Sequence, residues 1–519
     1  MNSAIRTLLL STGAVALATT FLPADEARAQ TQDRTLRVGV WDLPPGRGNP
    51  YTGSGTPSIL TWSAIYDALT FIDLSGKPTP ALAQRWRNVD PTTWEFTLRP
   101  NVKFHNGVPF TAQTLVDNIA WLQSDEGRTK GPSVSTRISF IAEASAPDAM
   151  TLRIKTKTPN PIVPAEISNI LVVEPKAWKD DFAGFVEKPI GTGTYRLDSM
   201  VDNQSAKLTA NDGHWTPPKI RRLEVFDIPE RPARLQAFQS NQLDVVLGLT
   251  PDNLPLMQQL GAKVDIRDGA QVLTWAFTQV NAREGLDVKP FQDKRVRQAL
   301  NYAVNKQSLV DDLLQGKGGI AMGQGVPTAA YGHNPNVKPY PYDPERAKRL
   351  LAEAGYPNLS FVVEVVPGAF PADGEIFQQT AADLKKIGVN AEVRVVSFAD
   401  WLKKFFPVGW EGPVWHNLWG SAPAMDATAA ILNQSCDKGG KPYICDKDGV
   451  QEKLRAQISS EFDAAKRLEL IHQLIAHQHE EAVNLFLIQF ANLHATHKNV
   501  DGFVNINQFI NYHEMRFNN

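Results

Sequence analysis

A strand–helix–strand pattern in the second half of the chain restricts the fold more than any other stretch. Phe361 to Val366 and Ala391 to Val396 are short runs rich in β-branched residues, and the residues from Ile376 to Ile387 between them have helical spacing. Two strands joined through a helix lie parallel in one sheet, because an antiparallel pair needs only a short turn. The pattern therefore predicts an α/β unit built on a parallel sheet.

Two amphipathic helices with well-marked ends precede this unit. Asp293 is suited to cap a helix that continues to Ala303, and Asp343 followed by Pro344 marks the start of another. Gly355 is suited to end the second helix, because glycine accepts the left-handed backbone conformation that follows a last helical turn. Each helix carries one apolar face, so we expect each to pack against a core on one side.

A strand, a turn and a helix start follow one another in the first third of the chain. The run from Trp94 to Leu98 alternates between apolar and polar residues, which is typical of a half-buried strand. Asn106-Gly107 is a hairpin-type turn signal, and Thr111 is suited to cap the helix that follows. This stretch predicts a mixed α and β segment from about residue 76 to residue 185.

The length and composition indicate a large globular protein. At about 150 residues per domain, a chain of 519 residues suggests about three domains. Hydrophobic residues make up 42% of the chain and charged residues 21%, which is typical of soluble proteins. The formal net charge of -2 gives no basis for binding nucleic acid or an anionic membrane surface, so neither is expected as a partner.

The first 29 residues have the features of a targeting segment. Arg6 provides a basic start, Leu8 to Phe21 is mostly apolar, and Ala27-Arg28-Ala29 has the form of a cleavage site. The apolar run is shorter than the about 20 residues that a membrane-spanning helix needs, and a retained N-terminal anchor is the alternative. We expect cleavage near Ala29, no lipid anchor because no cysteine lies near that site, and a mature chain in a Gram-negative periplasm.

The chain contains two cysteines, Cys436 and Cys445. In an oxidising compartment such neighbours are expected to form a disulfide that closes a short loop. By the chain-entropy argument, a disulfide that closes a loop of this length stabilises the folded protein by about 2–3 kcal/mol. Two free or catalytic thiols are the weaker alternative, because the spacing is not C-x-x-C and no base lies beside either cysteine.

Aromatic residues gather in the segment from Trp401 to Asp426. It contains four of the twelve tryptophans and one histidine, which are Trp401, Trp410, Trp415, Trp419 and His416. Aromatic side chains suit the wall of an enclosed pocket, because they combine a large apolar face with a polar edge. The segment therefore predicts ligand contacts from Trp410, Trp415, His416 and Trp419, and ordinary core packing is the alternative.

Trp41 is a further candidate for ligand contact. We expect the first strand of the mature chain from Thr35 to Val40, and Trp41 follows it directly. A loop rich in proline and glycine then continues to Thr56. Loops at strand ends often contact ligands, and a plain surface connection is the alternative.

Histidines are concentrated near the C-terminus. Six of the ten lie in the last 48 residues, namely His472, His477, His479, His494, His497 and His513. His479-Glu480 lacks the second histidine of an H-E-x-x-H motif, so we expect surface histidines and no metal site. His416 differs because it lies in the aromatic segment, where it could contact a ligand or a chelated metal.

Several stretches resemble signatures of the family 5 solute-binding proteins, which are the dipeptide, oligopeptide and nickel receptors of ABC importers. The stretch after Trp94 is similar to the family pattern F.LR..V.F..G.PF.A at Phe96, Leu98, Arg99, Val102, Phe104, Gly107, Pro109, Phe110 and Ala112. Asp293 to Ala303 resembles D.RVRQA...A, Pro189 to Tyr195 resembles P.GTG.Y, and Tyr342 to Gly355 resembles a further family signature.

The resemblance implies an α/β fold of two lobes, the large cluster C form of the periplasmic-binding-protein fold, with an extra α+β subdomain inserted in lobe I. Two crossing strands are expected to join the lobes. We expect a strand from Leu273 to Asn281, and a strand from Val483 to Gln489 that crosses back toward the first lobe. The implied division is a signal peptide over 1–29, lobe I over 30–75, 186–275 and 491–519, the inserted subdomain over 76–185, and lobe II over 276–490.

The resemblance also implies a function. The chain is expected to be the periplasmic substrate-binding component of an ABC importer, which captures a peptide-like or other small polar solute by hinge closure and delivers it to membrane permease subunits. We expect a monomer without cofactor and without catalytic residues. A secreted hydrolase acting on peptides or glycosides is the alternative, although no recognised catalytic motif is present.

One departure from the family pattern concerns the solute. Peptide receptors of the family resemble W..D in the aromatic segment, with the acid binding the terminal amine of the ligand. Here Ser421 or Ala422 stands where that acid is expected after Trp419, and Asp426 lies at a different offset. Because a buried ammonium without an acid partner is costly, the sequence disfavours a simple free-amine dipeptide. A modified peptide, an opine, a sugar conjugate and a metal chelate stay open, with Asp426 as a possible substitute acid.

Overall fold

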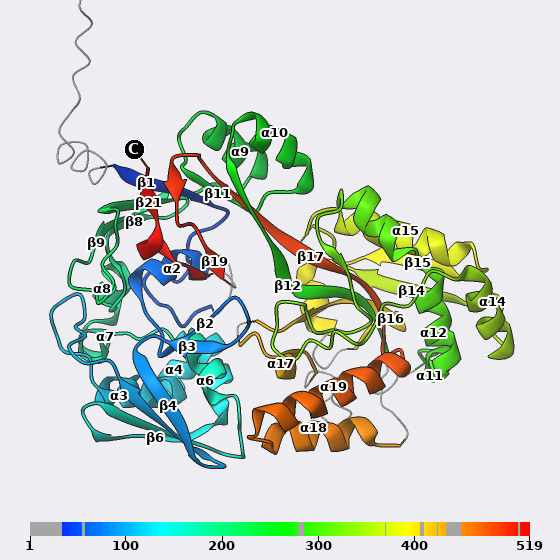
Figure 1. Ribbon diagram of the computed structural model, residues 1–519, viewed down its shortest axis with the longest axis horizontal. Helices are drawn as coiled ribbons and strands as arrows, with labels where there is room; N and C mark the ends of the chain where they lie inside the picture. Colours follow the sequence, from blue (N-terminus) through cyan, green and yellow to red (C-terminus); the bar gives the residue numbers. More distant parts are fainter. Residues whose placement is uncertain are drawn as a thin grey trace, which may run out of the picture.

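The computed structural model describes residues 34–53, 58–278, 285–368, 370–404, 409–422, 424–431, 448–506 and 509–518. These residues form two α/β lobes, which lie on the left and on the right in Figure 1. A mixed sheet runs through both lobes in the order β15-β14-β16-β12-β17-β11-β1-β10-β9-β8, with β13 (Gly319–Ile320) beside β17. The predicted two-lobe α/β fold is therefore confirmed.

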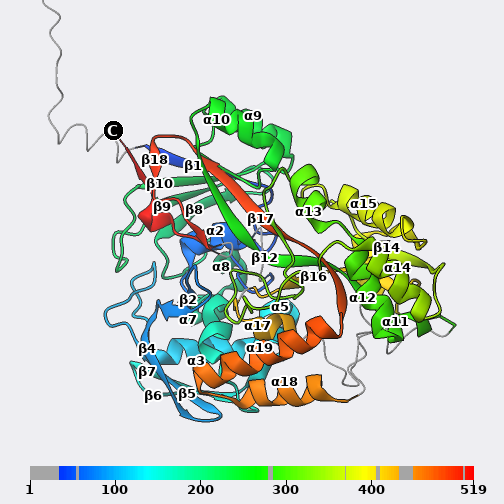
Figure 2. The same ribbon diagram turned by 45° about the vertical axis from the view of Figure 1, so that its right-hand side comes forward.

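Two long strands connect the lobes. They are β12 (Lys263–Phe277) and β17 (Asn484–Thr496), which pair antiparallel along almost their whole length and run diagonally between the lobes in Figures 1 and 2. Their register shifts between Asp268 and Val272, close to the middle of the pair. Both strands extend further toward lobe I than the sequence predicted, and the predicted lobe boundaries near 275 and 490 fall within them. The boundaries themselves stay predictions.

Lobe I is built on a sheet whose central strand is the first strand of the described chain. This strand, β1 (Thr35–Val40), pairs parallel with β10 (Arg222–Asp227) and with β11 (Val245–Leu247). The outer strands are β9 (Ser205–Ala210) and β8 (Tyr195–Val201), both antiparallel to their neighbours. The helices of this lobe are α2 (Ser58–Ile65), α9 (Arg231–Gln239) and α10 (Leu254–Gln259).

Lobe II contains the predicted strand–helix–strand unit. Strand β14 (Ser360–Val365) is joined to β15 (Asn390–Val395) through α15 (Asp373–Lys385), and the two strands are parallel as expected. On its other side β14 pairs parallel with β16 (Val414–Gly420), which is antiparallel to β12. The remaining helices here are α11 (Lys289–Gln292), α12 (Lys294–Ala303), α13 (Lys306–Ser308), α14 (Pro344–Glu353) and α16 (Phe398–Lys403).

The predicted helix ends in lobe II are confirmed by their hydrogen bonds. The Asp293 carboxylate accepts the backbone N–H of Arg295 at 2.8 Å, and the Asp343 carboxylate accepts that of Arg346 at 2.8 Å. Gly355 has a φ of +85° directly after α14, which is the conformation that favours glycine. These side chains satisfy backbone groups that a helix leaves open at its ends.

The inserted subdomain is a four-stranded antiparallel sheet with helices on one side (Figure 1). The sheet order is β4 (Ala83–Asp90), β5 (Thr93–Leu98), β7 (Thr151–Thr156) and β6 (Ile141–Asp148). Its helices are α3 (Ala112–Gln123), α4 (Asp125–Lys130), α5 (Pro132–Arg137), α6 (Val163–Glu166), α7 (Pro175–Asp180) and α8 (Phe182–Glu187). Thr111 caps α3 in a capping box, as predicted, and the subdomain shares a continuous apolar core with lobe I.

The lobes also touch each other away from the crossing strands. The helices α17 (Ala427–Ile431), α18 (Val450–Ser460) and α19 (Ala464–Glu480) of lobe II lie beside the inserted subdomain at the bottom of Figure 1. Their apolar cluster includes Ile72 of β2 (Thr70–Ile72) and Ala165 of α6, both from the lobe I side. The lobes therefore share a small buried core opposite the crossing strands.

The C-terminal residues return to lobe I in short strands. These are β18 (Val500–Asp501), β19 (Asn505–Ile506), β20 (Phe509–Ile510) and β21 (Arg516–Phe517), and β3 (Pro78–Pro80) pairs with β2 nearby. Within the described part of the chain, no helix is both long enough and apolar enough to cross a bilayer.

Gly269 provides a test of the crossing strands. It lies at their register shift, and a Cβ at this position would be 2.6 Å from the carbonyl oxygen of Phe490. We predict that Gly269→Ala lowers the free energy of unfolding by about 1–3 kcal/mol, because the two strands cannot stay in register around the added methyl group. Denaturant unfolding followed by circular dichroism measures this change.

Gly420→Ala is the matched control for this measurement. A Cβ at Gly420 would meet its nearest neighbours at 3.6 Å, an ordinary contact distance, in the strand beside β12. We expect this variant to unfold within about 0.5 kcal/mol of the wild type. Equal stability of both variants would show that the close approach of Gly269 to β17 does not hold the strands in register.

Candidate functional site

The parallel strands of both lobes end at the middle of the crossing pair. In lobe I, β11 ends opposite His494 of β17, and Leu249 just beyond it donates its N–H to the Leu493 carbonyl oxygen at 2.9 Å. In lobe II, β16 ends opposite Gln271 of β12. The carboxyl edges of the two half-sheets therefore face each other across the centre of the crossing strands. Ligands of open α/β sheets bind at such carboxyl edges, so this is the place where a solute is expected.

A cavity of about 300 Å³ lies at this position and is called the inter-lobe cavity below. Both lobes and both crossing strands contribute to its wall, which is formed by Asp73, Leu74, Arg267, Asp268, Ala270, Thr328, Ala329, Met425, Asn492, Asn505 and Ile506. Arg267 is paired with Asp265, with 2.9 Å between Nε and Oδ2. The wall thus presents carboxylates, amides and a guanidinium, which suits a polar solute.

Gln489 holds one rim of the inter-lobe cavity in place. Its amide nitrogen donates to the Gly269 carbonyl oxygen at 3.1 Å and to the Thr328 hydroxyl at 2.9 Å. Its amide oxygen accepts the backbone N–H of Thr328 at 3.1 Å. The hydroxyl of Thr328 in turn donates to Asp268. This buried side chain of β17 therefore ties a loop of lobe II to the register shift of β12.

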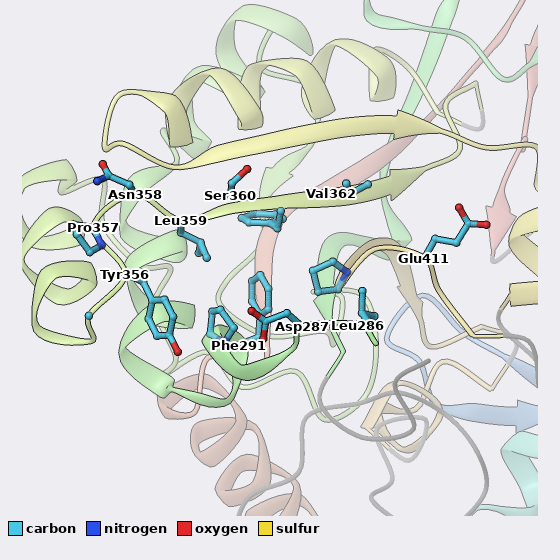
Figure 3. Close-up of a pocket in the computed structure, with 14 residues that line it drawn as sticks. Leu286, Asp287, Phe291, Tyr356, Pro357, Asn358, Leu359, Ser360, Val362 and Glu411 are labelled. Atoms are coloured by element: carbon cyan, nitrogen blue, oxygen red, sulfur yellow. The ribbon is translucent and has the colours of Figure 1, made fainter. Parts of the chain in front are cut away.

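A second hollow, of about 520 Å³, lies elsewhere on lobe II (Figure 3). Ser360, Phe361 and Val362 line it, and they form the amino-terminal half of β14. Phe291, Tyr356 and Glu411 are further lining residues from the same lobe. This hollow is therefore at the opposite end of β14 from the carboxyl edge, and lobe I contributes nothing to it.

The structure places two of the predicted tryptophans in the core of lobe II. The rings of Trp410 and Trp415 stack with their centroids 4.6 Å apart and their planes 7° apart, and both side chains are fully buried. Trp401 packs edge-on against Trp410 at 5.6 Å. This arrangement fits core packing, the alternative that the sequence left open. A ligand contact from Trp410 or Trp415 stays a prediction.

His416 and Trp419 lie nearer to the carboxyl edge of lobe II. His416 Nδ1 accepts the backbone N–H of Val366, the residue after β14, at 3.2 Å, which leaves the imidazole proton on Nε2. Burial lowers the pKa of His416 to about 4, so the ring is neutral at neutral pH. Trp419 is buried against Gly325, where a Cβ added by substitution would lie 3.1 Å from the indole. Both residues support the edge, and their contact with a ligand stays a prediction.

Asp426 already has a full set of partners within lobe II. Its two carboxylate oxygens accept the Arg467 guanidinium at 2.9 and 2.7 Å, and Oδ1 also accepts the backbone N–H of Thr428 at 2.8 Å. Asp426 and Arg467 are both buried. Direct contact between this carboxylate and a ligand ammonium would require Arg467 to be displaced. Ser421 and Ala422, the positions where the acid of the peptide receptors is expected, carry no charge, and Ser421 is buried.

Trp41 stands at the carboxyl edge of lobe I. It follows β1 directly and is half-buried, with the guanidinium carbon of Arg234 5.9 Å from its ring centre. The neighbouring Asp42 is exposed over much of its surface. The limited burial of its carboxyl, together with the charge of Asp227, raises the pKa of Asp42. The sequence selected Trp41 because it ends a strand, and the structure brings Arg234 to the same edge. No motif marked Arg234 as a ligand residue, because Trp41, its neighbour in the structure, is distant from it in the chain.

Several other predicted features lie apart from the site or outside the described residues. Cys436 and Cys445 fall outside the described residues, so their disulfide stays a prediction. Among the described residues, no group of three or more histidine, cysteine, aspartate or glutamate side chains is arranged to hold a metal ion. His494 is buried, not on the surface, and its Nδ1 accepts the backbone N–H of Gly248 at 3.2 Å. His479 hydrogen-bonds the Gly323 carbonyl oxygen at 3.1 Å.

Comparison with known proteins identifies the family. Residues 77–440 match the model of the bacterial extracellular solute-binding proteins, family 5 Middle. The chain belongs to the family 5 solute-binding proteins. As a member of this family, it has the substrate-binding role of the ABC-importer receptors that the sequence resembled, and the hydrolase alternative finds no support.

Curated relatives of this family 5 solute-binding protein carry different solutes in their names. The chain is 26% identical to the nickel-binding periplasmic protein of Escherichia coli, with 86% of this chain and 87% of the relative covered. It is also 26% identical to the dipeptide-binding protein of Escherichia coli, with 93% and 94% covered. These relatives are binding proteins and not enzymes.

Solved structures agree with the two-lobe fold. HbpA2 from Haemophilus parasuis superposes with a TM-score of 0.80 at 22% identity, covering 93% of this chain and 100% of that chain. NikA from Brucella suis in complex with Fe(III)-EDTA gives 0.79 at 22% identity, covering 94% and 100%. AgaA in complex with agropinic acid gives 0.73 at 20% identity, covering 94% and 99%.

The Asp426–Arg467 pair gives the first prediction for this site. We expect Arg467→Met to lower the free energy of unfolding by about 3–5 kcal/mol, because Asp426 would be left as an unpaired buried charge. The double variant Asp426→Leu with Arg467→Met should recover much of that loss, since it removes both charges. Thermal and denaturant unfolding of the three proteins measure both effects. A single variant as stable as the wild type would contradict a structural role for the pair.

Glu166 gives a second prediction, because it brings an acid from the inserted subdomain toward this pair. Burial and the Asp426 charge raise the pKa of Glu166 to about 7, although Arg467 and a 2.7 Å hydrogen bond from Asn160 oppose the shift. The folded protein therefore binds a proton that the unfolded chain releases near pH 4.5. This contribution to stability is complete below about pH 4.5 and is lost as the pH rises through about 7.

We expect Glu166→Gln to remove this pH dependence. The wild type should lose up to about 3 kcal/mol more stability than the variant between pH 4.5 and pH 8, which unfolding curves at several pH values measure. Glu375→Gln, at an exposed position on α15, is the control and should follow the wild-type profile. Identical profiles for wild type and Glu166→Gln would contradict the assignment.

Proposed function

We propose that this family 5 protein is the exported receptor of an ABC importer for a polar solute that lacks the free terminal amine of a simple dipeptide. The engagement of Asp426 by Arg467 is the observation that carries this proposal. Peptide receptors resembling this chain use an acid in this segment to bind the ligand amine. Here Asp426, the acid that follows Trp419, is paired with the buried Arg467, and Ser421 and Ala422 are uncharged.

The names of relatives leave a range of solute classes, among them a dipeptide, nickel, glutathione, an iron chelate and agropinic acid. A buried ammonium without an acid partner is costly, which weighs against the dipeptide class. An opine, a sugar conjugate, a modified peptide or a metal chelate needs no such acid. The polar wall of the inter-lobe cavity is compatible with each of these.

Hinge closure is the proposed mechanism. The solute would first bind one carboxyl edge, and the other lobe would then swing about β12 and β17 to enclose it. The closed form would be favoured only by the contacts that exist in that form, among them the core shared by β2, α6 and the helices α17 to α19. The closed receptor would then deliver the solute to the permease.

The same proposal includes export and a simple assembly. The apolar segment ending at Ala29 would direct the chain to the periplasm and be removed there. The mature protein would act as a soluble monomer that meets its membrane permease only transiently. The periplasmic relatives support this location.

Mass spectrometry of molecules released from the purified mature protein tests the proposed solute class. We expect a stoichiometric small molecule without a free peptide amine, and re-addition of that molecule should raise the unfolding temperature. At a concentration of 100 Kd, a ligand that binds only the folded state adds about 2.7 kcal/mol of stability.

A bound free-amine dipeptide would contradict the proposal for the solute and would point to Asp42 at the lobe I edge as its acid partner. If the protein is isolated empty, thermal-shift titration with a set of dipeptides and their N-acetylated forms replaces the first experiment. Stabilisation by the free-amine members alone would then be the contradicting result.

A further inference from the structure

Arg234 is a buried guanidinium that has no carboxylate partner among the described residues. Only 4% of the residue is exposed. Its Nη1 donates to the carbonyl oxygens of Ile228 and Pro229 at 2.6 and 2.7 Å. Its Nε is buried and has no acceptor among the described residues, and the two hydrogen bonds of the guanidinium both come from Nη1. Buried donors are nearly always hydrogen-bonded, so the open side of this guanidinium needs an explanation.

The position of Arg234 places this open side at the carboxyl edge of lobe I. The helix α9 starts soon after β10 ends, and Arg234 lies in its first turns. The ring of Trp41, at the end of β1, lies 5.9 Å from the guanidinium carbon. Gly248, at the end of β11, completes the group. Three neighbouring strand ends therefore bring an aromatic ring, a cation and a glycine together.

Gly248 leaves space between the other two residues. A Cβ there would lie 3.4 Å from the Trp41 ring and 3.6 Å from Arg234 Nη2, so an added atom fits without overlap. The backbone of Gly248 has a φ of +70°, which favours glycine at this strand end. An atom of a solute above Gly248 would contact the indole face on one side and the guanidinium on the other.

The electrostatics of Arg234 favour an anionic group in this space. Burial is the main cause that lowers the pKa of Arg234 to about 10, and the neighbouring Arg231 lowers it further. Glu230 acts in the opposite direction from an exposed position. The guanidinium is still charged at neutral pH, and no carboxylate within the described ranges contacts it. A carboxylate is its natural partner, because it accepts two parallel hydrogen bonds from an arginine.

We propose that Arg234, Trp41 and Gly248 form a subsite for a carboxylate of the solute. This inference rests on the proposed receptor function and narrows its solute to a carboxylate-bearing molecule. Lobe I would supply the cation and the aromatic face. Ser421 of lobe II stands near the place where peptide receptors carry an acid for the ligand amine, and it is uncharged. A solute that is held by its carboxylate would not need that acid.

A purely structural role is the competing explanation for Arg234. The two hydrogen bonds from Nη1 fasten the loop between β10 and α9, and this role uses neither Nε nor Nη2. Arg234→Lys keeps the positive charge and one donor for the loop but loses the flat donor pair. Arg231→Lys makes the same change at an exposed position three residues earlier and is the matched control.

The test uses succinate as a carboxylate probe and succinamide as its neutral counterpart. The mature protein is labelled with ¹⁵N-arginine and titrated with each compound, and the side-chain Nε resonances are followed by NMR. We expect the one resonance that disappears in Arg234→Lys to shift saturably with succinate and to stay unchanged with succinamide. Succinate affinity should fall at least about tenfold in Arg234→Lys and stay unchanged in Arg231→Lys.

Two results would overturn the subsite. One is a succinate titration in which the Arg234 resonance does not move, and the other is equal succinate affinity in both lysine variants. Failure of the subsite is distinguishable from failure of the receptor function. If the Arg234→Lys protein still carries the wild-type solute through purification, the subsite proposal fails and the receptor function stands. If the wild type binds succinate at Arg234 but carries and binds no solute, the receptor function fails and the subsite stands.

Discussion

The pairing of β12 with β17 is the interaction on which the rest of the structure depends. These strands belong to both lobes, so the hydrogen bonds between them hold the two lobes together. Their antiparallel direction also sets the direction of β11 and β16, which pair with them from either side. Because β1 and β14 run parallel to those two strands, the carboxyl edges of both half-sheets point to the same central region. The location of the solute site thus follows from strand direction.

The two lobes differ in the charge of the residues near this region. In lobe II, Asp426 and Arg467 neutralise each other, and His416 is neutral through burial. In lobe I, Arg234 keeps its charge and contacts no carboxylate of the residues that the structure describes. With the proposed subsite, Arg234 of lobe I would contribute a charge contact to the solute, whereas the Asp426–Arg467 pair of lobe II would contribute none. This division agrees with a family in which the fold is constant and the named solutes differ widely.

Much of the fold could be predicted from the sequence, because local signals and tertiary structure agree. The caps Asp293 and Asp343 and the β-α-β unit around α15 lie where their patterns placed them. The crossing strands were predicted too short, because Arg267 and Asp268 interrupt the apolar pattern at the place where the strands leave the lobes. Pairing with β17 overrides that local signal.

The site was harder to predict, because aromatic residues serve cores and pockets alike. Trp410 and Trp415 cannot be told apart from cleft residues by composition, and only their stacking inside lobe II reveals the core environment. The approach of Arg234 to Trp41 joins residues almost two hundred positions apart. Such contacts depend on how β1, β10 and β11 are ordered in the sheet, which no short pattern encodes.

The core shared by the two lobes has a thermodynamic consequence for the working cycle. Ile72 and Ala165 are buried against helices of the opposite lobe, so parting the lobes would hydrate apolar surface that is now dry. Hydration of apolar surface raises the heat capacity. Capture of a solute by the open form should therefore carry a negative heat-capacity change larger than a small polar molecule could cause by itself. The enthalpy of capture would then vary steeply with temperature. This temperature dependence would be determined mainly by the protein surface that closure buries and only slightly by the solute.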